Sequence, residues 1–151
     1  MDMFLDDAYY MRLALEEAAQ AAEAEEIPIG AVVVSPAGKV IGRGRNMTQA
    51  LNDVTAHAEM LAITAAENTL GAKYLTDCTL YVTVEPCPMC AGAIGWAQLG
   101  RVVYGASDPK RGYTRICRQD ATPLHPRTQV VAGILAEEAA ELMRNFFVNK
   151  R

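Results

Sequence analysis

The chain has 151 residues, of which 51% are hydrophobic and 21% are charged, and its formal net charge at pH 7 is -4. A chain of this length buries roughly 70% of its unfolded surface in one core, so the fold does not need disulfide bonds. Four cysteines are too few for a small secreted disulfide scaffold, and no apolar run approaches the roughly 20 residues of a membrane span. Residues 1–7 are acidic and unlike a signal peptide, so we expect a cytoplasmic protein. The length predicts one domain over residues 1–151, and the lack of a long apolar run predicts no membrane partner.

The charge is unevenly distributed along the chain. Acidic side chains outnumber basic ones in residues 1–100, whereas most of the 14 basic side chains fall in residues 101–151. A local excess of positive charge favours an anionic partner near the C-terminus. A solvated surface with uneven charge explains the same distribution.

The first half of the chain predicts a helix, a β-hairpin and a second helix. Apolar residues recur at helical spacing after Asp6 and Asp7, either of which is a natural N-cap, and Pro28 ends this helix. Gly71 ends the second helix. The predicted elements are a helix over residues 6–26, paired strands over 29–34 and 39–44, and a helix from 55 to about 70.

The second half predicts three strands and two helices. The predicted elements are strands over residues 78–84, 100–105 and 128–132, a helix from 86 to about 98, and a closing helix over 135–147. The first of these strands carries β-branched and aromatic residues on both faces, so we expect it at the centre of the sheet. Residues 106–127 are irregular, and loops this long in a compact domain tend to be functional. An α/β domain with a sheet of about five strands follows.

Two short motifs carry the chemistry. His57, Cys87 and Cys90 offer an imidazole and two thiols, and Glu59 adds a carboxylate two residues after the imidazole. A structural zinc site usually has four protein ligands, whereas a catalytic one keeps a position open for water. The obvious donors stop at three, so the motifs favour a catalytic Zn²⁺, which brings the pKa of its water to about 7 beside a carboxylate that moves protons.

The spacing places these donors at two helix ends. Cys87 and Cys90 are three residues apart at the start of a predicted helix, whose N-terminus favours thiolates, and prolines on either side of Cys87 suit its first turn. His57 and Glu59 would diverge in mid-helix, so they share a site only if it faces the helix end. We therefore expect the metal between two helix N-termini, at the carboxyl ends of the preceding strands.

Other interpretations of the cysteines remain open at this point. A Cys-x-x-Cys pair alone also fits a redox dithiol or half of a structural zinc site, but no second such pair follows, and His125 is the only other histidine. Cys78 and Cys117 are predicted to be a core thiol and a loop thiol.

At these residues the chain resembles the zinc-dependent nucleoside and nucleobase deaminases, whose established signature is H-x-E followed by P-C-x-x-C. The resemblance to the bacterial tRNA-specific adenosine deaminases extends to residues 26–32, 53–59, 79–93, 100–106 and 133–135, and to the pair Phe146-Phe147. It implies a cytidine-deaminase-like three-layer α/β/α fold with a mixed sheet.

The resemblance also implies an activity and a site. It implies hydrolytic deamination of the wobble adenosine in a tRNA anticodon loop to inosine, with release of ammonia, by a homodimer. One Zn²⁺ per chain would be held by His57, Cys87 and Cys90, with Glu59 as the catalytic proton carrier.

The resemblance further implies substrate contacts at Asn46, Ala58, Asp108, Lys110 and Phe147. Asn46 would hydrogen-bond the flipped base, and Ala58 would offer backbone contacts. Asp108 and Lys110 would contact ribose and phosphate, and Phe147 would flank the anticodon loop. Plainer roles are a turn residue for Asn46, a core anchor for Phe147 and a solvated charge for Lys110. The chain departs from the family pattern at residues 124–126 and at Val148.

Two rival functions share the motifs. A deaminase of a free base or nucleoside, of guanine or cytosine type, carries a similar Glu-Pro-Cys-Pro-Met-Cys stretch, although the basic last third of this chain favours RNA. A non-catalytic subunit of a deaminase complex would keep zinc only for folding and would have no use for Glu59.

Overall fold

The computed structural model describes residues 6–150; residues 1–5 of the acidic N-terminal segment and Arg151 of the basic tail lie outside this range. Five strands form a mixed sheet in the order β2-β1-β3-β4-β5. β1 is antiparallel to β2 and β3, whereas β3, β4 and β5 are parallel. The strands are β1 (Gly30–Val34), β2 (Val40–Arg45), β3 (Thr79–Val84), β4 (Arg101–Ala106) and β5 (Gln129–Ala132). The predicted sheet and the central place of β3 are confirmed.

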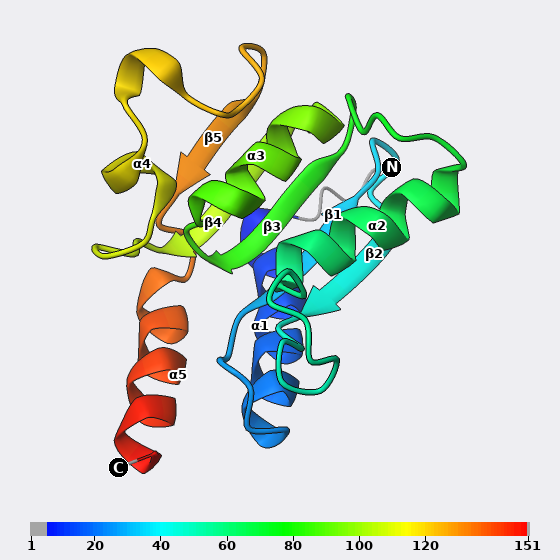
Figure 1. The fold of residues 1–151 in the computed structure, drawn as a ribbon. Helices are drawn as coiled ribbons and strands as arrows, with labels where there is room; N and C mark the ends of the chain where they lie inside the picture. Colours follow the sequence, from blue (N-terminus) through cyan, green and yellow to red (C-terminus); the bar gives the residue numbers. More distant parts are fainter. Residues whose placement is uncertain (1–5, 151) are drawn as a thin grey trace.

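Helices cover both faces of the sheet (Figure 1). The helices are α1 (Asp7–Glu23), α2 (Ala58–Leu70), α3 (Pro88–Ala97), α4 (Tyr113–Ile116) and α5 (Ala136–Asn149), with a 3-10 turn η1 (Gln119–Ala121). Alternate strand residues enter two cores: Val33 and Val82 pack under α2 and α3, while Val32 and Tyr81 pack against α1. Burial on both faces explains why β3 is apolar throughout, and the three-layer α/β/α arrangement is confirmed.

The first helix begins as predicted and ends earlier. Asp6 is the N-cap, and its side chain accepts a hydrogen bond from the Tyr9 N–H at 2.9 Å. The helix stops at Glu23 instead of Glu26, because Glu25 takes a left-handed backbone conformation with φ 63° and turns the chain. Glu26 therefore leaves the helix and is free to hold another segment.

The second helix starts three residues later than predicted. Asp53 accepts hydrogen bonds from the Thr55 N–H at 2.8 Å and the Thr55 hydroxyl at 2.7 Å, and this folds the chain into a turn in place of a helix. His57 becomes the N-cap residue of α2, which ends at Gly71 as predicted, with φ 67°.

The third helix begins at Pro88, with Cys87 as its N-cap residue. Only one of the two flanking prolines therefore lies in the first turn. Pro86 precedes the helix, and its carbonyl accepts a hydrogen bond from the Tyr113 N–H at 2.9 Å. The segment after β4 is largely irregular as predicted, but it contains the short helix α4 and the turn η1.

The start of α2 lies very close to β2. A Cβ atom at Gly44 would overlap the carbonyl of Ala58, and one at Gly42 would overlap the carbonyl of Ala62. Glycine at both positions lets the backbones of the helix and the strand touch. This contact fixes how closely the first turn of α2 packs on β2.

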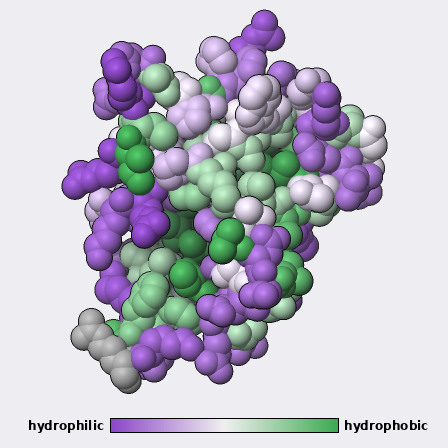
Figure 2. Space-filling model, viewed as in Figure 1, coloured by the Kyte–Doolittle hydropathy of each residue, from purple (hydrophilic) through white to green (hydrophobic). Residues whose placement is uncertain are grey.

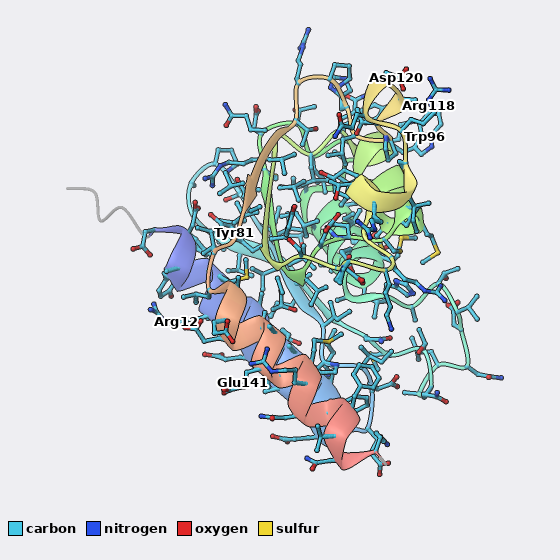
Figure 3. All side chains as sticks on the ribbon, turned by 90° about the vertical axis from the view of Figure 1, so that its left-hand side faces the viewer. Arg12, Tyr81, Trp96, Arg118, Asp120 and Glu141 are labelled. Carbon is cyan, nitrogen blue, oxygen red and sulfur yellow. The ribbon has the colours of Figure 1, made fainter. Side chains whose placement is uncertain are left out.

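The closing helix α5 runs beside α1 (Figure 3). Its C-terminal end is joined to the end of α1 by an ion pair between Lys150 Nζ and Glu25 Oε1 at 2.9 Å, so the two helices run parallel. Within the described part of α5 only Ala139 is buried, and the second half of the helix extends beyond the sheet (Figure 1). Among residues 6–150, no helix is both long and apolar enough to cross a bilayer.

The start of α1 is tied to the sheet by a charged cluster. Arg101 donates two hydrogen bonds to the Asp7 carboxylate, at 2.8 and 2.7 Å, and the Tyr81 hydroxyl donates a third at 2.7 Å. The hydrogen bonds from Arg101 lower the pKa of Asp7, against the opposing effect of burial. The cluster therefore stabilises the fold while Asp7 is ionised.

We expect Asp7→Asn to lower the melting temperature at pH 7 by roughly 2–6 °C. Because the pKa of Asp7 is lower in the folded state, its stabilisation is present above the ordinary value of about 3.9 and is lost as the pH falls through the folded-state value. The difference between variant and wild type should therefore shrink at pH 3, as measured by circular dichroism. Asp120→Asn, which breaks the exposed pair with Arg118, is the control and should change little. A difference of equal size at both pH values would refute this assignment.

Candidate metal centre and catalytic pocket

Three soft donors converge at one end of the sheet. The ligand atoms of His57, Cys87 and Cys90 all lie within 4.8 Å of one another. His57 and Cys87 are the N-cap residues of α2 and α3, and Cys90 is in the first turn of α3. Figure 1 shows both first turns at the end of the sheet where β3 terminates. The predicted convergence of these donors between two helix N-termini is confirmed.

The donor spacing fits zinc. Nδ1 of His57 lies 3.5 Å from Sγ of Cys90 and 3.7 Å from Sγ of Cys87. Zinc–sulfur bonds of about 2.3 Å and zinc–nitrogen bonds of about 2.0 Å at a tetrahedral angle separate nitrogen and sulfur by about 3.6 Å. One nitrogen and two sulfurs therefore suit one Zn²⁺ per chain and leave its fourth position for a non-protein ligand.

The three donors already interact electrostatically. Hydrogen bonding from Cys90, with a further contribution from His57, lowers the pKa of Cys87 to about 4. The contact with Cys87 raises the pKa of His57 and also, together with burial, that of Cys90. Cys87 is thus the thiolate of the pair, and a bound metal cation deprotonates both thiols.

Glu59 lies in the first turn of α2 and is only 4% exposed. Burial raises its pKa to about 7, although its own backbone N–H opposes the shift. A carboxyl group with a pKa near neutrality can both accept and release a proton at neutral pH. His57 and Glu59 line the same cavity, as predicted for residues that share a site at a helix end.

A cavity of about 550 Å³ lies beside the three donors. It brings together every side chain for which a substrate contact was expected, as well as several that the sequence analysis did not single out. The expected residues are Asn46, Ala58, Asp108, Lys110 and Phe147; the additional ones are Ile27, Ile29, Thr48, Glu85, Arg111 and Met143. Apolar groups and two cations therefore surround an acidic catalytic end.

The plainer roles hold for some of the lining residues. Asn46 is buried, and its Oδ1 accepts the Thr48 N–H at 3.1 Å, so it is a turn residue that also faces the cavity. Oδ1 of Asp108 accepts the N–H groups of Lys110 and Arg111 at 3.0 and 2.9 Å, so this oxygen shapes its own loop.

Phe147 is not a core anchor. Its side chain is 48% exposed, and it packs edge to face against Phe146 with ring centroids 5.2 Å apart. Val148 is also exposed, whereas Leu124, from the other stretch that departs from the family, is buried in the core. The predicted buried Cys78 is confirmed, and Cys117 is half-buried.

Two buried glutamates were missed by the sequence analysis. The Glu26 carboxylate accepts the N–H groups of Gln49 and Ala50 at 3.1 and 2.7 Å, and so holds the loop before α2. Glu85, at the end of β3, holds the segment after β4 in a similar way. For Glu85 the sequence did offer a signal: its carboxylate directly follows an apolar strand and belongs to the motif that contains Cys87 and Cys90.

A family model for the cytidine and deoxycytidylate deaminase zinc-binding region matches residues 5–106. The chain belongs to this deaminase family. The matched region contains the three converging donors and Glu59, whereas Asp108, Lys110 and Phe147 follow it. This deaminase is a zinc-dependent enzyme that hydrolyses an amidine C–N bond.

Three relatives show how this deaminase compares with known proteins. The tRNA-specific adenosine deaminase of Agrobacterium fabrum is 48% identical over 145 residues, which are 95% of each chain. A solved structure from studies of A-to-I editing by tRNA:A34 deaminases at the wobble position of transfer RNA is 46% identical, with a TM-score of 0.82, over 89% of this chain and 98% of the other. Guanine deaminase from Bacillus subtilis is 43% identical, with a TM-score of 0.65, over 68% of this chain and 66% of the other.

Proposed function

We propose that this enzyme hydrolyses the wobble adenosine of a tRNA anticodon loop to inosine and releases ammonia. The observation that carries the proposal is a donor set suited to zinc, with a buried glutamate beside it, in a cavity with cations on its rim. Lys110 and Arg111 fit an anionic backbone next to the base, which a free base does not have. The 48% identity to a tRNA-specific adenosine deaminase over nearly the full chain supports this substrate.

In this proposal His57, Cys87 and Cys90 hold the metal and Glu59 moves protons. Zinc, when bound, acts as a Lewis acid that lowers the pKa of water to about 7. Glu59 accepts a proton from the attacking water and delivers it to N1 of the purine as oxygen joins C6. The second water proton then passes through Glu59 to the amino group, the C6–N6 bond breaks, and ammonia leaves inosine behind.

The remaining cavity residues bind the substrate. The Asn46 side chain and the Ala58 backbone contact the flipped base, and Asp108 and Lys110 contact ribose and phosphate. Phe147 offers an exposed ring on which an adjacent base stacks. Extruding a base costs a few kcal/mol in a duplex, and an unpaired anticodon loop largely avoids this cost.

Incubation of the zinc-loaded protein with a tRNA anticodon stem-loop tests the proposal. We expect inosine at the wobble position, read by sequencing, with one ammonia released per inosine. No inosine at stoichiometric enzyme and full zinc occupancy would refute this substrate.

The second candidate is a guanine deaminase, favoured by the 43% identity to the Bacillus subtilis enzyme over two thirds of the chain. Ammonia release from guanine, with none from the stem-loop, would establish it in place of the first. A non-catalytic subunit is excluded by turnover of either substrate.

We also propose that the enzyme is a homodimer joined through α2 and α3. Apolar side chains gather over these helices on the face shown in Figure 2. Met60, Ile63 and Ala93 line a groove of about 490 Å³, with Tyr74 and Trp96 at its side. Trp96 is 84% exposed and projects from α3 away from α1 and α5 (Figure 3). A tryptophan that exposed, beside an apolar groove, suits the centre of an interface between two copies.

Trp96→Glu is expected to shift the protein from dimer to monomer in light scattering, raising the dissociation constant at least about 30-fold. The reason is that the variant places an unpaired charge in the interface. Trp96→Phe keeps an aromatic ring and should remain largely dimeric. A wild type that stays monomeric at all concentrations, or a dimeric Trp96→Glu variant, would contradict the proposed interface.

A single deaminase domain over residues 1–151 and a cytoplasmic location complete the proposal. One continuous sheet supports the single domain. None of the four cysteines is in a disulfide, which suits a reducing compartment, and cytoplasmic tRNA is the substrate proposed.

A further inference from the structure

Glu85 links the metal-binding motif to the segment after β4. It follows the last residue of β3 and precedes Cys87 by two residues, and its side chain is buried. Its Oε1 accepts the Asp108 N–H at 3.1 Å. Its Oε2 accepts the Thr114 N–H at 3.0 Å and the Thr114 hydroxyl at 2.6 Å. Both ends of the segment 108–114 therefore meet on one carboxylate.

The segment is shaped to fit this carboxylate. A Cβ atom at Gly112 would overlap the Glu85 carboxyl group where it lies here, so any larger residue would displace the carboxylate from its hydrogen bonds. The neighbouring Tyr113 N–H bonds to the Pro86 carbonyl at 2.9 Å. The segment thus rests on the two residues that lead directly into Cys87.

The same segment carries groups that face the cavity. Asp108, Lys110 and Arg111 line it, and the Asp108 carboxylate in turn accepts the N–H groups of the other two. A chain of hydrogen bonds therefore runs from Glu85 through Asp108 to the backbone N–H groups of Lys110 and Arg111, whose cationic side chains lie at the rim.

We infer that Glu85 is a positioning residue for the substrate: it holds segment 108–114 in register with the metal ligands and so sets where the ribose and phosphate groups of the substrate lie. This inference rests on the proposed function. Three donors converge on the carboxylate, and only an acceptor at both oxygens satisfies them. Glutamine has the same shape but turns one acceptor into a donor that faces a backbone N–H.

Glu85→Gln is the main test. The amide protons of Asp108 and Thr114 report on the hydrogen bonds directly, and we expect at least one of them to exchange with solvent roughly tenfold faster or more. With the anticodon stem-loop as substrate, KM should rise roughly tenfold or more while kcat changes less than about threefold. Zinc content should stay at one per chain.

A graded series separates positioning from general damage. Thr114→Val removes only the hydroxyl donor and should raise exchange and KM in the same direction but less, and Thr114→Ser, which restores a hydroxyl, should reverse that change. Glu17→Gln is the matched control, because Glu17 is also buried but lies on α1, outside the cavity, where it forms ion pairs with Arg43 and Arg45 of β2. It should leave exchange in residues 108–114 and KM unchanged.

Unchanged exchange at Asp108 and Thr114 together with an unchanged KM in Glu85→Gln would overturn the inference. An equal rise in KM in Glu17→Gln would also overturn it, because the effect would then be one of general stability. If Glu85→Gln loses zinc or fails to fold, the two Thr114 variants decide alone. Equal amide exchange and equal KM in Thr114→Val and Thr114→Ser would then refute the role of Glu85. Inactivity of the wild type on RNA would refute the proposed function, while the exchange measurement still tests Glu85.

Discussion

Replacement of Glu59 by glutamine is expected to lower the rate of deamination by roughly 10²–10⁴-fold or more. The amide has the size of the carboxylate but cannot accept a proton from water or return it to the purine and the leaving amine. Since the carboxylate is buried, the neutral side chain should not lower the melting temperature. The measurements are single-turnover inosine formation, zinc content and thermal unfolding.

Glu17→Gln again serves as the control, because it neutralises a buried glutamate outside the cavity. Wild-type turnover by the Glu59 variant would remove Glu59 from the mechanism. A loss of zinc in parallel with the loss of activity would show that Glu59 acts on metal binding and not as a proton carrier.

Loss of one metal ligand is the second large effect. We expect Cys90→Ala to bind much less than one zinc per chain, to lose activity by more than roughly 10³-fold, and to melt roughly 5 °C or more below the wild type. Cys90 is buried at the first turn of α3, and two donors do not hold zinc as three do. Removing zinc from the wild type with a chelator should produce the same losses, and added zinc should reverse them.

Cys117→Ser is the matched control, since Cys117 is a half-buried free thiol that lies outside the cluster of donors. It should retain zinc and activity. Full zinc occupancy in Cys90→Ala would exclude Cys90 from the ligand set and with it the tetrahedral site derived from the nitrogen–sulfur spacing.

The sequence was sufficient to predict where the metal ligands meet. Helix N-termini follow from capping residues and proline, and parallel strands bring such termini to one edge, so His57, Cys87 and Cys90 were expected together. The predicted start of α2 was wrong, because the hydrogen bonds from Thr55 to Asp53 outweigh helical propensity there. Local periodicity does not reveal competition of this kind between a turn and a helix.

The contacts of Glu26 and Glu85 could not be predicted, for a different reason. Apart from the Thr114 hydroxyl, their partners are backbone N–H groups, and the Glu85 partners lie 23 and 29 residues further along the chain. Any residue except proline carries an N–H group, so no side-chain pattern marks the partner. That Phe147 faces the cavity was expected only through the family resemblance, because an exposed ring and a core anchor look alike in sequence.

The close approach of α2 to β2 has a mechanical consequence. Gly42 and Gly44 leave no slack under the end of the helix that carries His57 and Glu59. Met143 and Phe147, which also line the pocket, belong to the second half of α5, a helix in which only Ala139 is buried. We therefore expect the side of the pocket that carries His57 and Glu59 to stay rigid, and α5 to be the part that adapts to substrates of different shape.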